Sequence, residues 1–142
     1  MRKINKIIIH CTATDAVKDY SVDDIRKWHL ARGFKDVGYH YIIHLDGTVS
    51  VGRSPHEPGA HCAGYNKHSI GICYVGGLLN GKPADTRTDL QKKSLITLLK
   101  MMRCTYGDDI TIHGHKEFAN KACPCFDVEE LRKEVFNYVK KD

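Results

Sequence analysis

Three consecutive isoleucines, Ile7, Ile8 and Ile9, place the strongest constraint on the fold of this chain. An unbroken β-branched run leaves no polar side for solvent, so it predicts a strand that is buried on both faces. His10 follows the run directly and is expected at the carboxyl end of that strand. Cys11 points to the opposite face from His10, because side chains alternate along a strand, and is expected to pack in the core.

Three helix signals follow along the chain. A capping-box pattern begins at Ser21 and predicts a helix of about three turns that ends near Gly33. A second capping box at Thr88 precedes a leucine-rich stripe and predicts a helix up to Gly107. Asp127 is expected to cap a last helix.

Strand signals lie between these helices. Asp46-Gly47 stands between two β-rich runs, 39–45 and 48–51, and predicts a hairpin. Further short strands are expected over 69–75 and 110–112. The order strand, helix, hairpin, strand, helix, strand, helix predicts an α/β fold, with a central mixed β-sheet flanked by helices and ligands bound at the strand ends.

Composition predicts one domain over residues 1–142. The chain has 22 Lys and Arg against 17 Asp and Glu, a formal charge of +5, and is 42% hydrophobic. These values exclude a disordered chain, and a chain of this length needs no disulfides to fold. The basic residues form no clustered stripe with interleaved aromatic residues, so nucleic acid is not an expected partner.

The first residues carry charge and only three consecutive apolar side chains, Ile7–Ile9. That run is too short for a signal-peptide core or a membrane span. Synthesis in the cytoplasm without membrane insertion is therefore expected. The six cysteines are expected to stay reduced there.

Nine histidines and six cysteines suggest metal chemistry. Three positions at or after strand ends can supply ligands: His10, either His113 or His115, and either Cys123 or Cys125. Imidazole nitrogen and thiolate sulfur suit zinc, and three protein ligands leave a fourth position for water, as in catalytic sites. Spacing alone does not choose within either pair. A structural zinc site built on Cys123-Pro124-Cys125 is disfavoured, because no second cysteine pair stands at a suitable spacing.

Other histidines have simpler interpretations. His29 and His56 are expected in solvent. His40 and His44 are expected either at the hairpin surface or as residues that orient metal ligands. Trp28 is expected in the core.

A series of sequence blocks, in one order, carries a resemblance to a known family. The blocks are Ile9–Thr14, Ile25–His29, Asp36–Ile43, Asp46–Val49, Gly52–Arg53, Gly59–Asn66, Ser69–Ile72, Gly114–Glu117 and Lys121–Pro124. They resemble the zinc-dependent N-acetylmuramoyl-L-alanine amidases of the type 2 group, which includes short phage amidases and peptidoglycan recognition proteins. The phage branch is the most similar, and the resemblance extends from Ile8 to about Asp127.

The resemblance implies a set of site residues. The family's zinc ligands correspond to His10, His115 and Cys123, which together hold one zinc ion per chain. Its catalytic tyrosine corresponds to Tyr39 and its catalytic lysine to Lys121. The implied reaction is hydrolysis of the amide between N-acetylmuramic acid and the L-alanine of the stem peptide.

Further residues match the family's substrate groove. His61, Asn66 and Ser69 are implied as contacts to peptidoglycan or muropeptides, and Arg53 as a partner for a stem-peptide carboxylate. The phage-like motifs favour a phage or prophage endolysin that reaches the cell wall through a phage pore, and we expect a monomer. Two other settings stay open: turnover of recycled wall fragments in the cytoplasm, and delivery to the wall by an export machine. The alternative is a recognition module that binds peptidoglycan without cleaving it.

Overall fold

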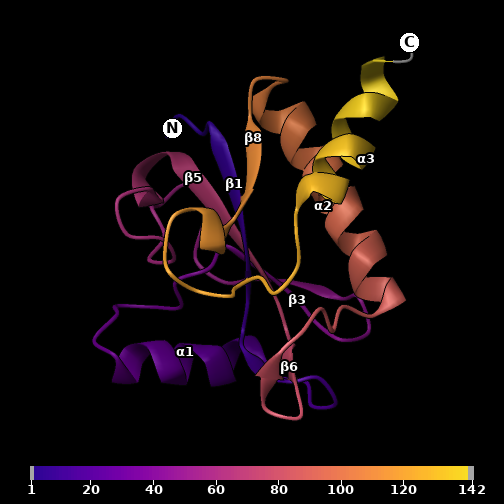
Figure 1. Ribbon diagram of the computed structural model, residues 1–142. Coiled ribbons are helices and arrows are strands. Elements are labelled where there is room, and N and C mark those ends of the chain that lie inside the picture. Colours follow the sequence, from indigo (N-terminus) through magenta and orange to yellow (C-terminus); the bar gives the residue numbers. More distant parts are fainter. Residues whose placement is uncertain (1, 141–142) are drawn as a thin grey trace.

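A five-stranded mixed sheet forms the centre of the protein, shown in the computed structural model of Figure 1. The structure describes residues 2–140, with side chains described as far as residue 136. The strand order is β4-β3-β5-β1-β8, and the strands are β1 (Lys6–Cys11), β3 (Tyr41–Ile43), β4 (Val49–Val51), β5 (Ser69–Tyr74) and β8 (Thr111–Gly114). β1 is parallel to both β5 and β8, β3 is parallel to β5, and β4 is antiparallel to β3. The predicted mixed sheet is confirmed.

The isoleucine run occupies the position that its sequence predicts. Ile7, Ile8 and Ile9 have no exposed surface, and their strand β1 is paired on both edges. His10 is the next-to-last residue of β1 and pairs in register with Cys73 of β5. The central strand therefore delivers His10 to the carboxyl end of the parallel strands.

Two helices pack on one face of the sheet and one on the other. α2 (Asp89–Tyr106) and α3 (Glu129–Lys140) lie together in Figure 1, while α1 (Val22–Ala31) lies apart from them. Leu95 and Leu99 of α2 belong to one buried apolar cluster with Ile7, Ile9 and Cys11. The expectation that Cys11 packs in the core is confirmed.

Local signals set the element ends. Ser21 and Thr88 both form the predicted capping boxes, with reciprocal side-chain hydrogen bonds to the third helical residue. Gly107 ends α2 with a φ of 102°, a conformation that suits glycine. Gly47 in the predicted hairpin turn has a φ of 86° for the same reason.

The structure also contains elements that the sequence did not predict. A small second sheet joins β2 (Thr14–Asp15), β6 (Gly77–Leu79) and β7 (Lys82–Pro83), and two 3-10 turns, η1 (Asn66–His68) and η2 (His115–Glu117), follow the loops. These segments of two or three residues are too short to show a hydrophobic period.

The prediction that Trp28 is a core residue is wrong. Its side chain is 37% exposed, and its ring packs edge-on against Tyr20 with 4.8 Å between the ring centroids. Helix α1 lies at the edge of the molecule and buries only Ile25 and His29 fully, so the tryptophan meets solvent.

Among the described residues, no helix combines the length and the apolar character needed to cross a membrane.

Candidate metal centre and cleft

Three side chains from separate parts of the chain converge beyond the end of β1. They are His10 of β1, His115 at the start of η2, and Cys123 in the loop that follows. One potential ligand atom from each lies within 4.8 Å of the other two. His10 is 1% exposed, and its Nδ1 lies 3.9 Å from Sγ of Cys123. The structure therefore brings together the three residues that the family resemblance implies as ligands.

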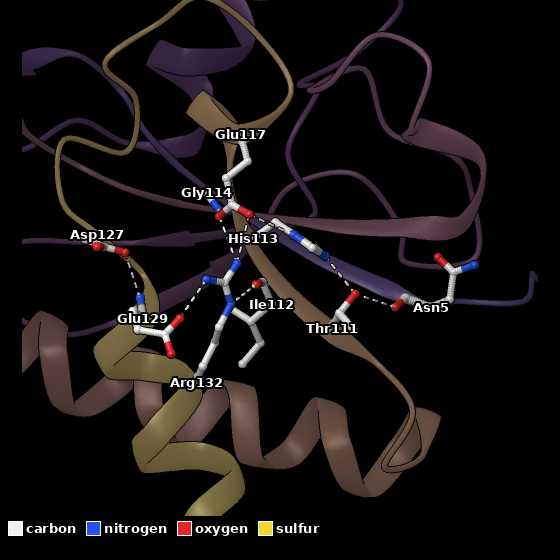
Figure 2. Close-up of polar contacts among 9 residues, drawn as sticks. All are labelled: Asn5, Thr111, Ile112, His113, Gly114, Glu117, Asp127, Glu129 and Arg132. Carbon is white, nitrogen blue, oxygen red and sulfur yellow. Dashed lines mark hydrogen bonds and ion pairs between the residues drawn. The ribbon is translucent and has the colours of Figure 1, made fainter.

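The structure also separates the histidines that spacing alone left open. β8 ends at Gly114, so strand alternation stops before His115, which turns towards His10. His113 instead hydrogen-bonds Glu117 at 3.1 Å and Thr111 at 2.7 Å (Figure 2).

The two candidate cysteines differ in the same way. Sγ of Cys125 lies 3.7 Å from Sγ of Cys11, whose side chain belongs to the apolar core. Cys123 instead faces His10. Among the described residues, the group that can hold a metal contains Cys123 and not Cys125.

Hydrogen bonds orient the donors of this group. Nε2 of His10 is hydrogen-bonded to Nδ1 of His61 at 2.8 Å, and Nε2 of His61 lies 3.2 Å from the Ser69 hydroxyl. The other nitrogen of His10, Nδ1, is therefore the one turned towards Cys123. The Cys11 backbone N–H donates to Sγ of Cys123 at 3.2 Å. Such partners fix the direction in which a ligand atom points.

The environment favours neutral imidazoles. Burial, together with His61, His115 and Lys121, holds the pKa of His10 well below its usual value. Burial and the Lys121 ammonium also lower the pKa of His115. Neutral imidazole is the form that binds a metal.

Two adjoining cavities form a cleft over the group. The smaller, of about 190 Å³, is lined by His10, Cys123 and Tyr39, and the larger, of about 410 Å³, by Asn66, Phe34 and Phe118. The residues that line both cavities are Arg32, Ala60, His61, His115 and Lys121. The candidate metal centre therefore faces the smaller cavity, and its member His115 also lines the larger one.

Tyr39 and Lys121 both line this cleft. The ring of Tyr39 lies 5.2 Å from that of His10, and burial raises the pKa of its phenol well above the usual value. Lys121 is exposed, lines both cavities, and has no ion pair with any carboxylate among the described side chains. A neutral phenol and a free ammonium thus face the same space.

The four residues implied as substrate contacts take different positions. His61 and Asn66 line the larger cavity, and Oδ1 of Asn66 also accepts from the backbone N–H groups of His61 and Cys62. Ser69 is fully buried beneath His61.

Arg53 does not line either cavity. Its guanidinium donates to the backbone carbonyls of Asp36, Val37 and Pro58, and the residue is only 5% exposed. We interpret Arg53 as a support for the loops around the cleft, since its donors are already engaged.

The expectation for His29 is wrong, and burial excludes one of the two alternatives for His40 and His44. His29 is buried, not solvated: its Nδ1 accepts from the Gly38 backbone N–H at 2.7 Å, and burial lowers its pKa to about 4. His40 and His44 are buried too, so neither lies on the hairpin surface. His29 follows Ile25 by four residues on one helix face, a spacing that could have signalled its burial. His56 is exposed, as expected.

Arg32 is a cleft residue that sequence reasoning missed. It caps the carboxyl end of α1 and lies over the ring of Phe34, with its guanidinium carbon 5.0 Å from the ring centroid. Its position at a helix end gives no periodic signal, so only the fold reveals that it lines both cavities.

The fold and the site together define an α/β domain with a candidate catalytic metal centre in an open cleft. Residues 1–126 match the family model described as N-acetylmuramoyl-L-alanine amidase, and the chain belongs to this family. The expected peptidoglycan amidase is thereby confirmed at the level of the family.

Individual relatives agree with this assignment. The chain is 44% identical over 124 residues to the endolysin of Escherichia phage T7, covering 87% of this chain and 82% of the relative. It is 41% identical over 129 residues to the endolysin of Klebsiella phage KP32, covering 90% and 85%. The solved structure of N-acetylmuramoyl-L-alanine amidase LysC from Clostridium intestinale aligns with a TM-score of 0.82 at 30% identity, covering 94% and 86%.

Peptidoglycan recognition proteins are also similar. A peptidoglycan-recognition protein of Drosophila melanogaster is 30% identical over 129 residues, covering 87% of this chain and 70% of the relative. The bumblebee PGRP-SA structure aligns with a TM-score of 0.76 at 28% identity, covering 98% and 84%. The fold is therefore shared by both kinds of protein.

Proposed function

We propose that this chain is a zinc-dependent amidase that hydrolyses the bond between N-acetylmuramic acid and the L-alanine of the stem peptide. The observation that carries the proposal is the group of His10, His115 and Cys123, with ligand atoms within 4.8 Å of one another, in a chain of the amidase family. The group faces a cleft with space for a sugar-peptide substrate.

The donor set fits zinc. Two imidazoles and one thiolate are ligands that zinc prefers, and three protein ligands leave one coordination position open. His61 and the Cys11 backbone N–H orient two of the donors, which is the usual support for a metal site. When bound there, zinc supplies Lewis-acid polarisation of a carbonyl and lowers the pKa of water to about 7. We propose one zinc ion per chain.

Lys121 stabilises negative charge in this mechanism. Its ammonium reaches the wall shared by both cavities and is free of acidic partners among the described side chains. As the scissile carbonyl becomes tetrahedral, its oxygen gains charge that a nearby cation stabilises. Lys121 precedes Cys123 by two residues, so the same loop carries a ligand and the cation.

Tyr39 supplies a hydrogen-bond donor. Its pKa is raised by burial, so the hydroxyl keeps its proton at neutral pH. It stands beside His10 in the smaller cavity and can donate a hydrogen bond to the attacking oxygen or to the amine nitrogen that leaves.

Substrate contacts are assigned by position in the cleft. We propose that His61 and Asn66 line the path of the substrate, with Ser69 acting through His61. Arg32 and Lys121 give the cleft a positive side, which suits the carboxylates of a stem peptide.

The biological setting that we propose is lysis of the bacterial wall by a monomeric endolysin. The endolysins of phages T7 and KP32 support this setting over wall recycling. A protein made in the cytoplasm then needs a phage pore or an export machine to reach the wall. Comparison of rates on intact sacculi and on soluble anhydro-muropeptides tests the setting, and a strong preference for the soluble fragments would contradict it.

Product analysis tests the reaction. Purified protein incubated with peptidoglycan should release intact stem peptides with a free L-alanine amine, and a chelator should stop the release until zinc is restored. Muramic reducing ends would indicate a glycosidase and overturn the proposal. Tight binding without any product would support the recognition module instead.

A further inference from the structure

The turn that carries His115 is held by a charged network that the proposed mechanism does not use. Figure 2 shows this network between β8, η2 and α3. His10 stands on a central strand with partners on both edges, whereas β8 is an edge strand that, among the described strands, pairs only with β1. His115 follows that edge strand in a three-residue turn. Its position therefore depends on contacts beyond the sheet.

Glu117 closes this turn around His115. One carboxylate oxygen accepts from the Gly114 backbone N–H at 2.8 Å, and the other lies 3.1 Å from Nδ1 of His113. The residues bound by the carboxylate thus precede His115, while Glu117 itself follows it. A side chain that bridges the two sides of a turn restricts the backbone between them.

Arg132 of α3 holds Glu117 in that position. Its Nη2 donates to both carboxylate oxygens of Glu117, at 2.8 and 2.9 Å, and its Nε donates to the Ile112 carbonyl of β8 at 2.8 Å. Its Nη1 donates to Glu129 at 3.0 Å. One planar guanidinium therefore joins α3, the end of β8 and the turn at η2.

Anchoring α3 does not require this network. Leu131 and Val135, on either side of Arg132 along the helix, are buried in the main apolar cluster. The side chains of Arg132 and Glu117 are 30% and 34% exposed, and ion pairs of that exposure contribute little to stability. The apolar side of α3 holds the helix in place. The main effect of the Arg132–Glu117 pair is therefore to fix the turn that carries His115.

We propose that Glu117 and Arg132 are positioning residues that hold His115 in place for metal binding. The inference rests on the proposed zinc site but adds residues to it, and Arg132 lies outside the segment 1–126 that matches the amidase family. In this chain, α3 therefore raises the affinity of the site for its metal. The two side chains act through His115 and touch neither metal nor substrate.

Zinc affinity of the folded protein tests this role. Glu117→Gln and Arg132→Met are titrated against a competing chelator beside the wild type, after removal of metal. We expect the zinc dissociation constant to rise about 10–100-fold in each, the usual effect of losing a partner that supports a metal ligand. The double variant should lose little more than either single one, because both changes break the same pair. Excess zinc should restore kcat, with KM unchanged.

Glu129→Gln is the matched control. It makes the same chemical change at another carboxylate on the same guanidinium, but among the described residues Glu129 forms no hydrogen bond with the turn. Its zinc dissociation constant should stay within about twofold of the wild type. Thermal unfolding of the metal-free proteins is measured in parallel, and Arg132→Lys replaces Arg132→Met if the latter does not fold.

The outcomes separate this inference from the proposed function. If the variants unfold more easily but bind zinc as tightly as the wild type, the pair has only a structural role and the inference is overturned. If Glu129→Gln weakens zinc binding as much as Glu117→Gln, it is overturned as well. If the wild type itself binds no zinc, the proposed metal site is wrong, and this inference is overturned with it.

Discussion

The two faces of the central sheet have different roles, although the same strands build both. Ile7, Ile9 and Cys11 of β1 point to the face under α2 and α3, where the buried cluster is apolar. His10, between two of them in sequence, points to the other face and meets His61 and His115. Alternation along one strand thus separates an apolar core from a cleft that contains the candidate metal centre.

The two faces contribute differently to the stability of the fold. The α2/α3 face gains stability from apolar burial, whereas the cleft face buries several imidazoles that must stay neutral. His29 and His40 each accept a backbone N–H through Nδ1, which partly offsets that burial. Changes on the first face should mainly alter stability at every pH, and changes on the second should mainly alter the chemistry or the pH dependence of stability.

The largest effect should come from the apolar face. Leu99 is fully buried in the main cluster, so Leu99→Ala leaves a cavity and should lower the free energy of unfolding by about 2–5 kcal/mol. Urea denaturation measures this loss. At temperatures where the variant is folded, its zinc affinity and kcat should match the wild type; a large loss of zinc affinity would show that the two faces are coupled.

Lys121 gives the contrasting change on the cleft face. Lys121→Ala removes the cation that we propose stabilises the developing oxyanion, so kcat should fall by about 10²–10³-fold. Bound zinc and the unfolding temperature should stay near wild-type values, because the side chain is exposed. Lys116→Ala, an exposed lysine that lines neither cavity, is the control. Full activity in Lys121→Ala would remove this residue from the mechanism.

Acid should destabilise the protein through the buried histidines of the cleft face. The pKa of His29 and that of His40 are both lowered to about 4 by burial, below the ordinary value of about 6.5. Between these values the unfolded chain binds more protons than the folded one, so stability is complete above pH 6.5 and falls as the pH drops to 4. The loss should be roughly 2–3 kcal/mol for each histidine.

Substitutions test the source of this acid sensitivity. His40→Asn keeps an acceptor for the Gly71 N–H and removes the titration, so its urea midpoint should change less between pH 7 and pH 4. His56→Asn, at an exposed position, should leave the pH profile unchanged. An unaltered profile in His40→Asn would mean that other groups cause the acid sensitivity.

The smallest effect should come from Ser69. Ser69→Ala removes the hydroxyl beside Nε2 of His61, and a single hydrogen bond of this kind contributes about 1 kcal/mol. We expect a slight loss of stability and weaker zinc binding of a few-fold, since Ser69 reaches His10 only through His61. Zinc binding weakened as strongly as in a ligand variant would show that the hydroxyl is itself part of the metal site.

Sequence reasoning predicted the elements with local signals. The isoleucine run, both capping boxes and the Asp-Gly hairpin turn are encoded within a few residues, and each is confirmed. The small second sheet has strands of two or three residues and was missed. The periodic pattern also failed for Trp28, because a helix at the edge of the molecule does not bury its whole apolar side.

The site was predictable only in part. The position of His10 follows from its strand, but the choice of His115 over His113 depends on where β8 stops, which spacing does not reveal. The burial of His29 and the reach of Arg132 to Glu117 depend on contacts between distant segments. The resemblance to the family identified the proposed ligands, whereas the residues that support them could be identified only from the fold.

Zinc content tests the central claim most directly. Wild-type protein, Cys123→Ala and Cys125→Ala are purified identically, and bound zinc is measured by mass spectrometry together with release of stem peptides from peptidoglycan. We predict one zinc ion per chain and full release for the wild type and for Cys125→Ala, and loss of both for Cys123→Ala. Zinc retained in Cys123→Ala but lost in Cys125→Ala, or amide cleavage by a zinc-free protein, would contradict the account.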